Sequence, residues 1–487
     1  MGIIASSRPI GPERAAYAAG SLGLWLEEAR AMVGLALPIV CSQLGLIAMQ
    51  TTDVIMLARL GPDYMAAGSL GFAVYFNVWL FCLGILIASA SLVAQAYGAR
   101  DYRGVRRSVR QAFWVALTLA LPAMALIWNG HHLLLWAGRD GAVVDHARTY
   151  LHTIVWGIPF SLGFLVLRYF VSALSRPKIV MVALIGGALI NGLLDYLLIF
   201  GHLGFPALGV AGAAGATAAV HVGLFLTLAT FVLRDRQFRR FHVFARFTRP
   251  DWQRYLEVWR VGLPVGVTVV AESGLFLSAQ LLMLRLGTLN VAAHAVALQI
   301  TAVAFMIPLG VGQAGQVRVG QHFGARDVEG VRRAAWVAAA LGCGFMACTA
   351  TLMWLAPGAV VSLIVDPGDP QLLPVFNLAV SFLVVAALFQ IFDGAQAVMS
   401  CSLRGLCDTA WPMALAMTGY WGIGFVAAYL LAFEAGLGGI GVWYGLALGL
   451  AVVAAALTTR FSLRRRLGLL DRHRLSALPS RAARTET

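Results

Sequence analysis

Twelve long apolar stretches divide this chain, separated by short segments that hold charge, glycine or proline. About 20 apolar residues in helical conformation cross the hydrocarbon core of a bilayer, and each stretch is long enough. Hydrophobic residues make up 60% of the 487 residues and charged residues 12%, about half the charged share of soluble domains. The sequence therefore predicts an all-α integral membrane protein with twelve transmembrane helices. The expected spans are 31–58, 66–97, 109–136, 150–174, 179–200, 208–233, 258–284, 292–322, 334–356, 372–401, 411–432 and 440–462.

Arginine and lysine are distributed unevenly over the loops between these spans. They cluster after the even-numbered spans, the twelfth included, whereas the loops after the odd-numbered spans hold few of them. Because an excess of lysine and arginine marks the cytoplasmic side, we expect both termini to be cytoplasmic. The net charge of +14 then follows from topology and does not indicate nucleic-acid binding. The longest basic loop, 234–257, is expected to lie on the membrane surface as an amphipathic helix.

Two further features have simple interpretations. The six cysteines form no CxxC pair and lie mostly within or beside apolar stretches, which is typical of small packing residues. The first 30 residues carry Arg8, Arg14 and Arg30 without the apolar core or cleavage site of a signal peptide. We therefore expect the first apolar span to be retained.

One ten-residue motif occurs twice. GARDYRGVRR occupies 98–107, and GARDVEGVRR occupies 324–333, which is 226 positions later. Shorter matches at the same offset align three consecutive spans of one half with three of the other. They are Leu37-Pro38 with Leu263-Pro264, Arg59-Leu60-Gly61 with Arg285-Leu286-Gly287, Ala66-Ala67 with Ala292-Ala293, and Leu83-Gly84 with Leu309-Gly310. The chain is thus expected to form two homologous six-helix bundles with the same orientation, an arrangement found in alternating-access transporters.

The repeat also predicts how the chain is divided. The expected segments are a cytoplasmic N-terminal segment 1–30, an N-terminal bundle 31–233, a cytoplasmic basic linker 234–257, a C-terminal bundle 258–462 and a cytoplasmic basic tail 463–487. The two repeated loops then join equivalent helix pairs at their cytoplasmic ends. They are either tight glycine turns with orienting arginines, or gating ion pairs made by Arg100 with Asp101 and by Arg326 with Asp327.

Three classes of function fit such a membrane protein: a transporter or flippase, a membrane-embedded enzyme, and a channel or receptor. An enzyme would need a nucleophile, metal ligands or a paired base inside the spans, but neither GxSxG nor HExxH occurs. The histidines within the spans, His152, His221 and His294, are isolated from one another in sequence. A channel has no obvious need for a tandem repeat, so a transporter is favoured.

Carboxylates inside the expected spans are the strongest functional candidates, because a charge at the bilayer centre costs about 3 kcal/mol on insertion scales. They are Asp53, Asp195, Glu272 and Asp393. Asp53 and Asp195 each lie six residues from an outer helix end, about 9 Å deep. Asn191 is one helical turn from Asp195, and Thr217 falls at a similar depth. Four polar side chains are thus expected to converge in the N-terminal bundle, whereas Glu272 and Asp393 lie nearer the middle of the membrane in the C-terminal bundle.

At these residues the chain resembles the multidrug and toxic compound extrusion (MATE) transporters, nearest their bacterial NorM-type branch. The resemblance covers most of 31–460, and its most specific stretch, AAHAVALQITAVAFMIPLGVGQAGQVRVGQHFGA (292–325), looks like the family's eighth helix and following loop. The family's polar positions fall on Asp53 (helix 1), Asn191 and Asp195 (helix 5), Thr217 (helix 6), Glu272 (helix 7) and Asp393 (helix 10). The resemblance implies an antiporter, not an enzyme, that exports cationic, amphiphilic compounds against an inward flow of H⁺ or Na⁺.

The resemblance also implies two sites. The cation-coupling site comprises Asp53, Asn191, Asp195 and Thr217, and a substrate or second cation site comprises Glu272, Asp393, Gln299 and Phe389. NorM-type proteins commonly have a tyrosine where this chain has Phe389. The missing hydroxyl weakens a C-terminal cation site and mildly favours protons, although the oxygen ligands at either site are also compatible with Na⁺.

The same resemblance implies the remaining properties. We expect no cofactor beyond the coupling ion, small cationic organic substrates, and a monomer in the bacterial inner membrane. A lipid-linked oligosaccharide flippase of related fold is the alternative, but it would need a cationic cavity to bind pyrophosphate. Apart from Arg168, the spans contain chiefly carboxylates, which favours cationic cargo.

Overall fold

The computed structural model describes residues 12–136, 141–244 and 251–471, and within these ranges it contains helices and no strands. Twelve helical spans of the described chain are long and apolar enough to cross a membrane, which confirms the predicted number and class. The helices are α1 (Pro12–Ala58), α2 (Pro62–Leu86), α3 (Ala88–Gly98), α4 (Tyr102–Trp128), α5 (Gly130–Trp136), α6 (Ala142–Ile154), η1 (Val155–Gly157), α7 (Ile158–Ala173), α8 (Lys178–Phe200), α9 (Val210–Arg234), α10 (Arg236–Arg239), α11 (Trp252–Arg285), α12 (Thr288–Gly324), α13 (Val328–Leu355), α14 (Pro357–Val361), α15 (Leu373–Gly405), α16 (Ala410–Met417), η2 (Thr418–Phe425), α17 (Val426–Tyr429), η3 (Leu430–Glu434) and α18 (Gly438–Ser462).

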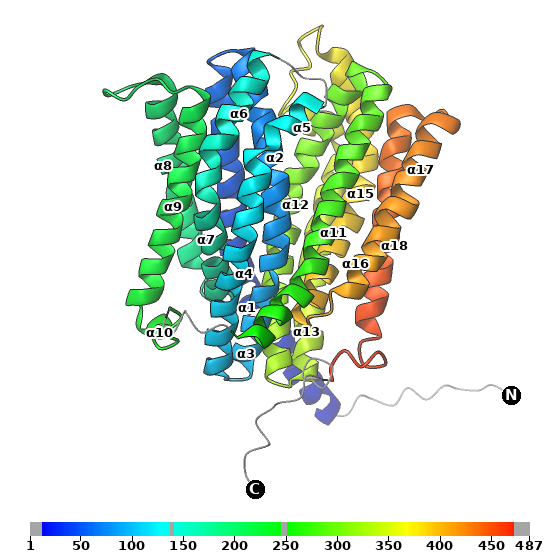
Figure 1. Ribbon diagram of the computed structural model, residues 1–487. Helices are drawn as coiled ribbons and strands as arrows, with labels where there is room; N and C mark the ends of the chain where they lie inside the picture. Colours follow the sequence, from blue (N-terminus) through cyan, green and yellow to red (C-terminus); the bar gives the residue numbers. More distant parts are fainter. Residues whose placement is uncertain (1–11, 137–140, 245–250, 472–487) are drawn as a thin grey trace, which may run out of the picture.

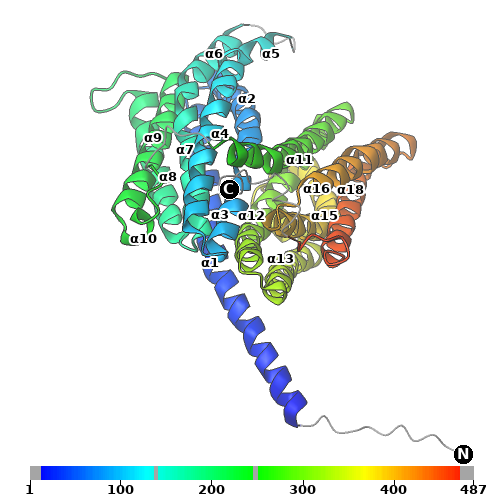
Figure 2. The same ribbon diagram turned by 60° about the horizontal axis from the view of Figure 1, so that its bottom comes forward.

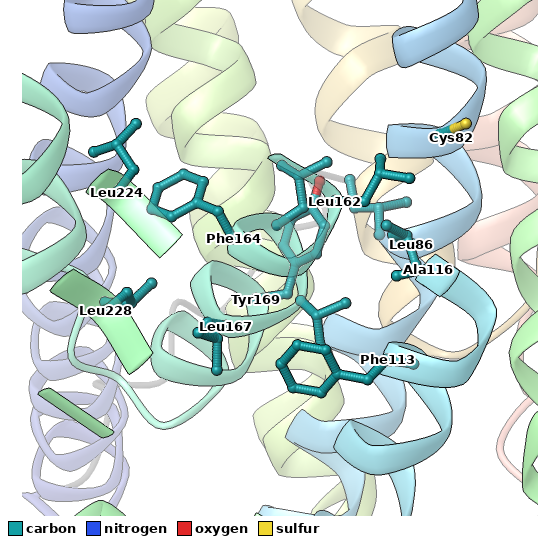
Figure 3. Packing of buried hydrophobic residues seen from close by; sticks show 14 of the residues in the cluster. Cys82, Leu86, Phe113, Ala116, Leu162, Phe164, Leu167, Tyr169, Leu224 and Leu228 are labelled. Atoms are coloured by element: carbon teal, nitrogen blue, oxygen red, sulfur yellow. The ribbon is translucent and has the colours of Figure 1, made fainter. Parts of the chain in front are cut away.

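The helices form two bundles that lie side by side (Figure 1). Helices α1 to α9 make up the N-terminal bundle and α11 to α18 the C-terminal bundle, with α10 near the foot of α9. The repeated loops and both ends of the described chain lie at the lower end in Figure 1, which we call the basic end. Each bundle has its own apolar core. Figure 3 shows that of the N-terminal bundle, where Phe113, Tyr169 and Leu228 come from three different helices.

Two long helices belong to both cores. The first part of α1 contributes Met32 and Ile39 to the C-terminal core, and its later part contributes Met49 to the N-terminal core. The opposite holds for α11, whose Val258 and Val265 are in the N-terminal core while its later residues pack in the C-terminal one. Val258 and Val265 are 226 positions after Met32 and Ile39. The two bundles therefore exchange equivalent helix segments at the basic end.

The repeated glycines mark where the bundles touch most closely. A Cβ atom at Gly98 would overlap the backbone carbonyl oxygen of Gln321, and a Cβ at Gly324 would overlap that of Gln95. These two contacts are equivalent under the offset of 226. A side chain at either position would push the backbones apart, so the glycines let α3 and the end of α12 approach directly. This pair of contacts brings the backbones of the two bundles together at the basic end.

A second pair of close contacts lies further from the loops. A Cβ at Gly84 would lie 2.6 Å from the Cα of Gly266, and one at Gly310 would lie 3.1 Å from the backbone nitrogen of Val40. Gly310 follows Gly84 by 226 positions, and Gly266 follows Val40 by the same number. The contact between α2 and α11 thus has its counterpart between α12 and α1, and both interfaces depend on a missing side chain.

The turns of the repeated loops differ from the expected glycine turns. The residues with left-handed backbone are Arg100 (φ 57°) and Arg326 (φ 63°), not the glycines. Asp101 accepts a hydrogen bond from the Gly104 backbone nitrogen at 2.8 Å, and Asp327 accepts one from that of Gly330 at 2.7 Å. The aspartates therefore cap the next helices, and in the described structure neither forms a salt bridge with the arginine before it.

The expected surface helix over 234–257 is wrong for the part of this linker that the structure describes. Helix α9 ends at Arg234, and α10 covers only Arg236–Arg239. Phe238 and Phe241 are buried, and both contact Phe170 of α7 edge-on. These aromatic contacts draw the linker against the bundle. Residues 245–250 of this linker lie outside the described ranges, as do residues 1–11 and 472–487 of the terminal segments that we expect to be cytoplasmic.

Candidate functional site

Three helices of the N-terminal bundle bring the predicted coupling residues together. Asp53 is in the later part of α1, Asn191 and Asp195 are one turn apart on α8, and Thr217 is on α9. All four side chains are buried, with Asp53 7% exposed and Asp195 fully enclosed. The depth argument from the sequence therefore identified residues that are in contact.

Hydrogen bonds join all four side chains. The Asn191 amide nitrogen donates to Asp53 Oδ1 at 2.5 Å and to Asp195 Oδ2 at 2.7 Å. The Thr217 hydroxyl donates to Asp53 Oδ2 at 3.0 Å. Asp195 Oδ1 is buried without a partner. One amide group thus bridges two carboxyl groups, which also lie within hydrogen-bonding range of each other.

This arrangement suits one small positive charge. Two like charges in a dry site oppose each other, so the pair is stabilised by one shared proton or one bound cation. The carboxyl, amide and hydroxyl oxygens are hard ligands of the kind that Na⁺ accepts, and the same atoms hold a proton. No group of three or more histidine, cysteine, aspartate or glutamate side chains within the described ranges could hold a metal ion.

Two tyrosines near this network were not among the predicted site residues. Tyr150 of α6 is buried and lies within electrostatic range of Asp53 and Asp195. Tyr75 of α2 is also buried and lies within electrostatic range of Tyr150. Both are polar aromatics within apolar spans, which is a signal in the sequence. Because neither tyrosine is within a helical turn of Asp53 or Asp195 in sequence, the sequence did not indicate that they lie near the network.

The predicted C-terminal site is less connected. Glu272 of α11 is half-buried, and Asp393 of α15 is buried with its Oδ1 unpartnered. Each lies within electrostatic range of the other, but no hydrogen bond joins them in the described structure. Gln299 of α12 is exposed and makes no hydrogen bond to either carboxylate. Glu272 and Asp393 therefore lie near each other, but no hydrogen-bond network joins them as one joins the N-terminal site residues in the described structure.

Phe389 takes part in aromatic packing instead of polar contacts. It is buried and meets Phe276 edge-on at a centroid distance of 6.1 Å and Trp443 at 5.5 Å. Trp443 also contacts the His294 ring, and both His294 nitrogens are buried without partners. The position that lacks a hydroxyl is therefore filled by a ring cluster one turn from Asp393.

A π-helical segment beside the C-terminal carboxylates was also missed. In η2, the Tyr420 hydroxyl accepts a hydrogen bond from the Gln396 amide nitrogen at 2.6 Å. The Trp421 indole of the same segment donates to the carbonyl oxygen of Ala271, which precedes Glu272. π-helical turns occur frequently at functional sites. The segment TGYWGIGF has several glycines but no pattern that distinguishes this geometry from an α-helix.

Comparison with known proteins places the chain in a family. The MatE family model matches residues 38–197 and again 264–430. The chain belongs to the MATE family. The two matches start 226 positions apart, the same offset as the repeated motif. Membership makes the protein a membrane transporter and not an enzyme.

Relatives and solved structures agree with this membership. The chain is 44% identical to a probable multidrug resistance protein NorM from Mesorhizobium japonicum, over 91% of this chain and 96% of that one. It is 40% identical to one of the same name from Pseudomonas aeruginosa, over 94% of each. A eukaryotic MATE transporter has the same fold (TM-score 0.82, 19% identity, 93% and 99% covered). So does a multidrug resistance MATE transporter in an outward-facing conformation (TM-score 0.81, 22% identity, 91% and 97% covered).

Proposed function

We propose that this protein is an H⁺- or Na⁺-coupled antiporter that exports cationic, amphiphilic compounds by alternating access. The observation that carries the proposal is the buried network of Asp53, Asn191, Asp195 and Thr217, where one amide group bridges two carboxyl groups. Such a network can hold one exchangeable proton or cation. The names of the relatives from M. japonicum and P. aeruginosa support drugs as the cargo.

Coupling requires that the ion bind one conformation better than another. Asp53 lies on α1, which also contributes residues to the core of the C-terminal bundle. Any change in the hydrogen bonds of Asp53 is therefore transmitted along a helix that reaches both bundles. The glycine contacts at the basic end support a conformation in which access from that end is blocked.

Glu272 and Asp393 serve as the substrate or second cation site in this proposal. The unpartnered Asp393 oxygen and the half-buried Glu272 offer negative charge that internal hydrogen bonds do not satisfy. A cationic organic molecule supplies the missing charge and stacks on aromatic rings such as Phe276. A lipid-linked oligosaccharide flippase would need several cations in this region, and the carboxylates here favour cationic cargo.

The proposal includes the predicted orientation, with both termini in the cytoplasm and the chain in the bacterial inner membrane. The basic end of the structure is then the cytoplasmic end. Single cysteines at 63 and 203, in a cysteine-free background, should react with an impermeant maleimide added to intact cells. Cysteines at 102 and 328 should react only after permeabilisation, and their labelling in intact cells would reverse the orientation.

The Asp53→Asn variant tests the function. It keeps the size of the side chain and removes its charge, so gradient-driven dye export should cease while dye binding stays within about tenfold, or about 1.4 kcal/mol. Efflux is measured in proteoliposomes with separately imposed pH and Na⁺ gradients, and binding is measured in detergent. A variant that still concentrates dye against its gradient would show that Asp53 does not couple transport.

A further inference from the structure

Arg168 carries a positive charge inside the protein that the proposed mechanism does not use. It lies on α7, and it is 5% exposed. Its Nη2 donates to the Gln43 side-chain oxygen at 2.7 Å. Among the described residues, no carboxylate forms an ion pair with it. The charge is therefore buried beside a neutral acceptor alone.

A buried guanidinium normally has a counter-charge and more hydrogen-bond acceptors than Gln43 supplies. It presents five N–H donors and stays protonated in proteins, and burying a charge without a counter-charge is strongly unfavourable. Two partly buried arginines show the usual solution. Arg460 forms two hydrogen bonds with Asp408, at 2.6 and 2.9 Å, and Arg318 forms two with Glu28, at 2.8 and 2.5 Å. Arg168 lacks such a partner. Arg464 is equally enclosed, and it too has only a neutral acceptor, the Phe461 carbonyl oxygen, among the described residues. Arg168 differs in that it also lines a cavity.

A small cavity lies next to Arg168. Its lining includes Tyr169 and Ser172 of α7 and Gln313 and Gln316 of α12, and its volume is about 20 Å³. A space of this size holds one water molecule or one ion of similar size. Arg168 brings the charged donors to this space, and the rest of its lining is apolar, from Ile39, Ile87, Ala90 and Val317. A monatomic halide ion is of the size that this space holds.

We propose that Arg168 and this cavity form a binding site for a single monatomic anion, chloride under ordinary conditions. The ion accepts hydrogen bonds from the guanidinium and neutralises its charge within the protein. A water molecule would satisfy the donors but would leave the charge uncompensated. The proposal is independent of the coupling ion and of the cargo.

The position of the site links the anion to conformation. Arg168 is in the N-terminal bundle, whereas Gln313 and Gln316 are in the C-terminal bundle. The Gln316 amide also donates to Ser91 of α3 at 2.9 Å, across the same interface. If the bundles part at the basic end, the cavity opens and water solvates Arg168. Chloride therefore binds the closed arrangement better, and it stabilises that arrangement by its difference in affinity.

Thermal unfolding with exchanged anions tests the site without relying on transport. The Tm of the purified protein is measured while gluconate is replaced by chloride at constant ionic strength and cation concentration. A rise of a few degrees is expected, and it should continue with the logarithm of the chloride concentration, because a ligand at concentration c that binds only the folded protein stabilises it by RT ln(1 + c/Kd). Arg168→Gln should abolish the rise, and Arg168→Lys, which retains the charge, should keep part of it. Arg460→Gln is the matched control, since it removes an arginine that has its own carboxylate, and its chloride response should persist.

Crystals of the wild-type protein grown in bromide give a direct location without any variant. An anomalous peak within hydrogen-bond distance of the Arg168 guanidinium is expected. Equal Tm values in chloride and gluconate, or a chloride response that survives in Arg168→Gln, would overturn the proposal. Bromide crystals without a peak at Arg168 would do the same and would leave water in the cavity.

Discussion

The two bundles are alike at the basic end and differ in the middle. Gly98 and Gly324 make equivalent contacts with the opposite bundle, and Asp101 and Asp327 cap equivalent helices. Deeper in the protein, the N-terminal bundle joins two carboxyl groups through Asn191, whereas the C-terminal carboxylates share no hydrogen bond in the described structure. The duplicated residues are therefore those that pack the bundles together and cap their helices, whereas the buried polar groups of the two sites are not duplicated.

The two sites differ in the hydrogen bonds that their carboxylates make. In the N-terminal network the polar atoms satisfy one another, except for one oxygen of Asp195. At the C-terminal site, Asp393 has a buried oxygen without a partner, and no hydrogen bond joins it to Glu272 in the described structure. Buried polar groups are normally hydrogen-bonded. A network whose members bind one another suits a small ion that binds and leaves, whereas two carboxylates that lack such a network suit a larger cationic ligand.

The largest expected effect tests whether the C-terminal carboxylates bind the cargo while the N-terminal network couples transport to an ion. Glu272→Gln and Asp393→Asn remove charge with little change in volume, so each should weaken the binding of a cationic dye by at least tenfold, about 1.4 kcal/mol. A pH or Na⁺ gradient should still drive the residual transport at saturating dye. Equilibrium binding and efflux in proteoliposomes give the two values. If either variant abolishes coupling while Asp53→Asn preserves it, the roles of the two bundles are reversed.

A smaller effect tests the equivalence at the basic end. Gly98→Ala and Gly324→Ala each place a methyl group against backbone, which cannot rotate away. Overpacking of this kind costs about 1–3 kcal/mol, so the population of the closed arrangement should fall by about 5-fold to 150-fold. The two variants should shift it by similar amounts, as measured by spin-label distances across the basic end.

Gly223→Ala provides the control for these variants, because a Cβ at that position of α9 meets no atom within 4 Å. It should leave the distances unchanged. A strong effect from Gly98→Ala combined with none from Gly324→Ala would show that the repeated contacts are not equivalent.

The smallest effect concerns a contact that is not duplicated. Arg107 of α4 donates to Asp251 at 2.5 Å, before α11, whereas the equivalent Arg333 lies 3.6 Å from Asp327. Burial alone would raise the pKa of Asp251, but the hydrogen bond and charge of Arg107 lower it below its usual value. The contribution to stability is therefore complete above the usual pKa and is lost as the pH falls through the lower folded value.

Asp251→Asn should accordingly lower the free energy of unfolding at pH 7 by less than about 1 kcal/mol, because Arg107 is partly exposed, and the Tm should fall slightly. The difference from wild type should shrink in acid and in high salt. A difference that is independent of pH would assign the contact to packing and not to charge.

The sequence predicted much of this architecture for identifiable reasons. Long apolar stretches identified twelve spans because the bilayer sets a minimum length. The N-terminal site was predictable because helical spacing places Asn191 beside Asp195, and depth brings Asp53 to the same level. Both signals depend on positions along helices, which a sequence shows directly.

Other features depend on contacts between distant segments and could not be predicted in this way. Gly98 and Gly324 are needed because of backbone contacts with the opposite bundle, whereas the repeated loop motif by itself suggested only a turn. Phe238 and Phe241 draw the linker inward because of Phe170, which is remote in sequence. The π-helical turn around Tyr420 depends on its tertiary packing, and Arg168 gave no sign of which groups would surround it.

The division of α1 between two cores has a consequence for how the chain is assembled. Met32 and Ile39 belong to the C-terminal core, yet α12 and α13, the helices of that core on which α1 packs, follow more than 200 positions later in the chain. Contacts of such long sequence separation form late. The start of α1 must therefore wait in the membrane until the second bundle has been inserted, and a fragment released after six spans would contain a helix with half of its packing surface uncovered. We expect an isolated N-terminal bundle to be a substrate for membrane quality control, and the two halves to regain stability when they are produced together.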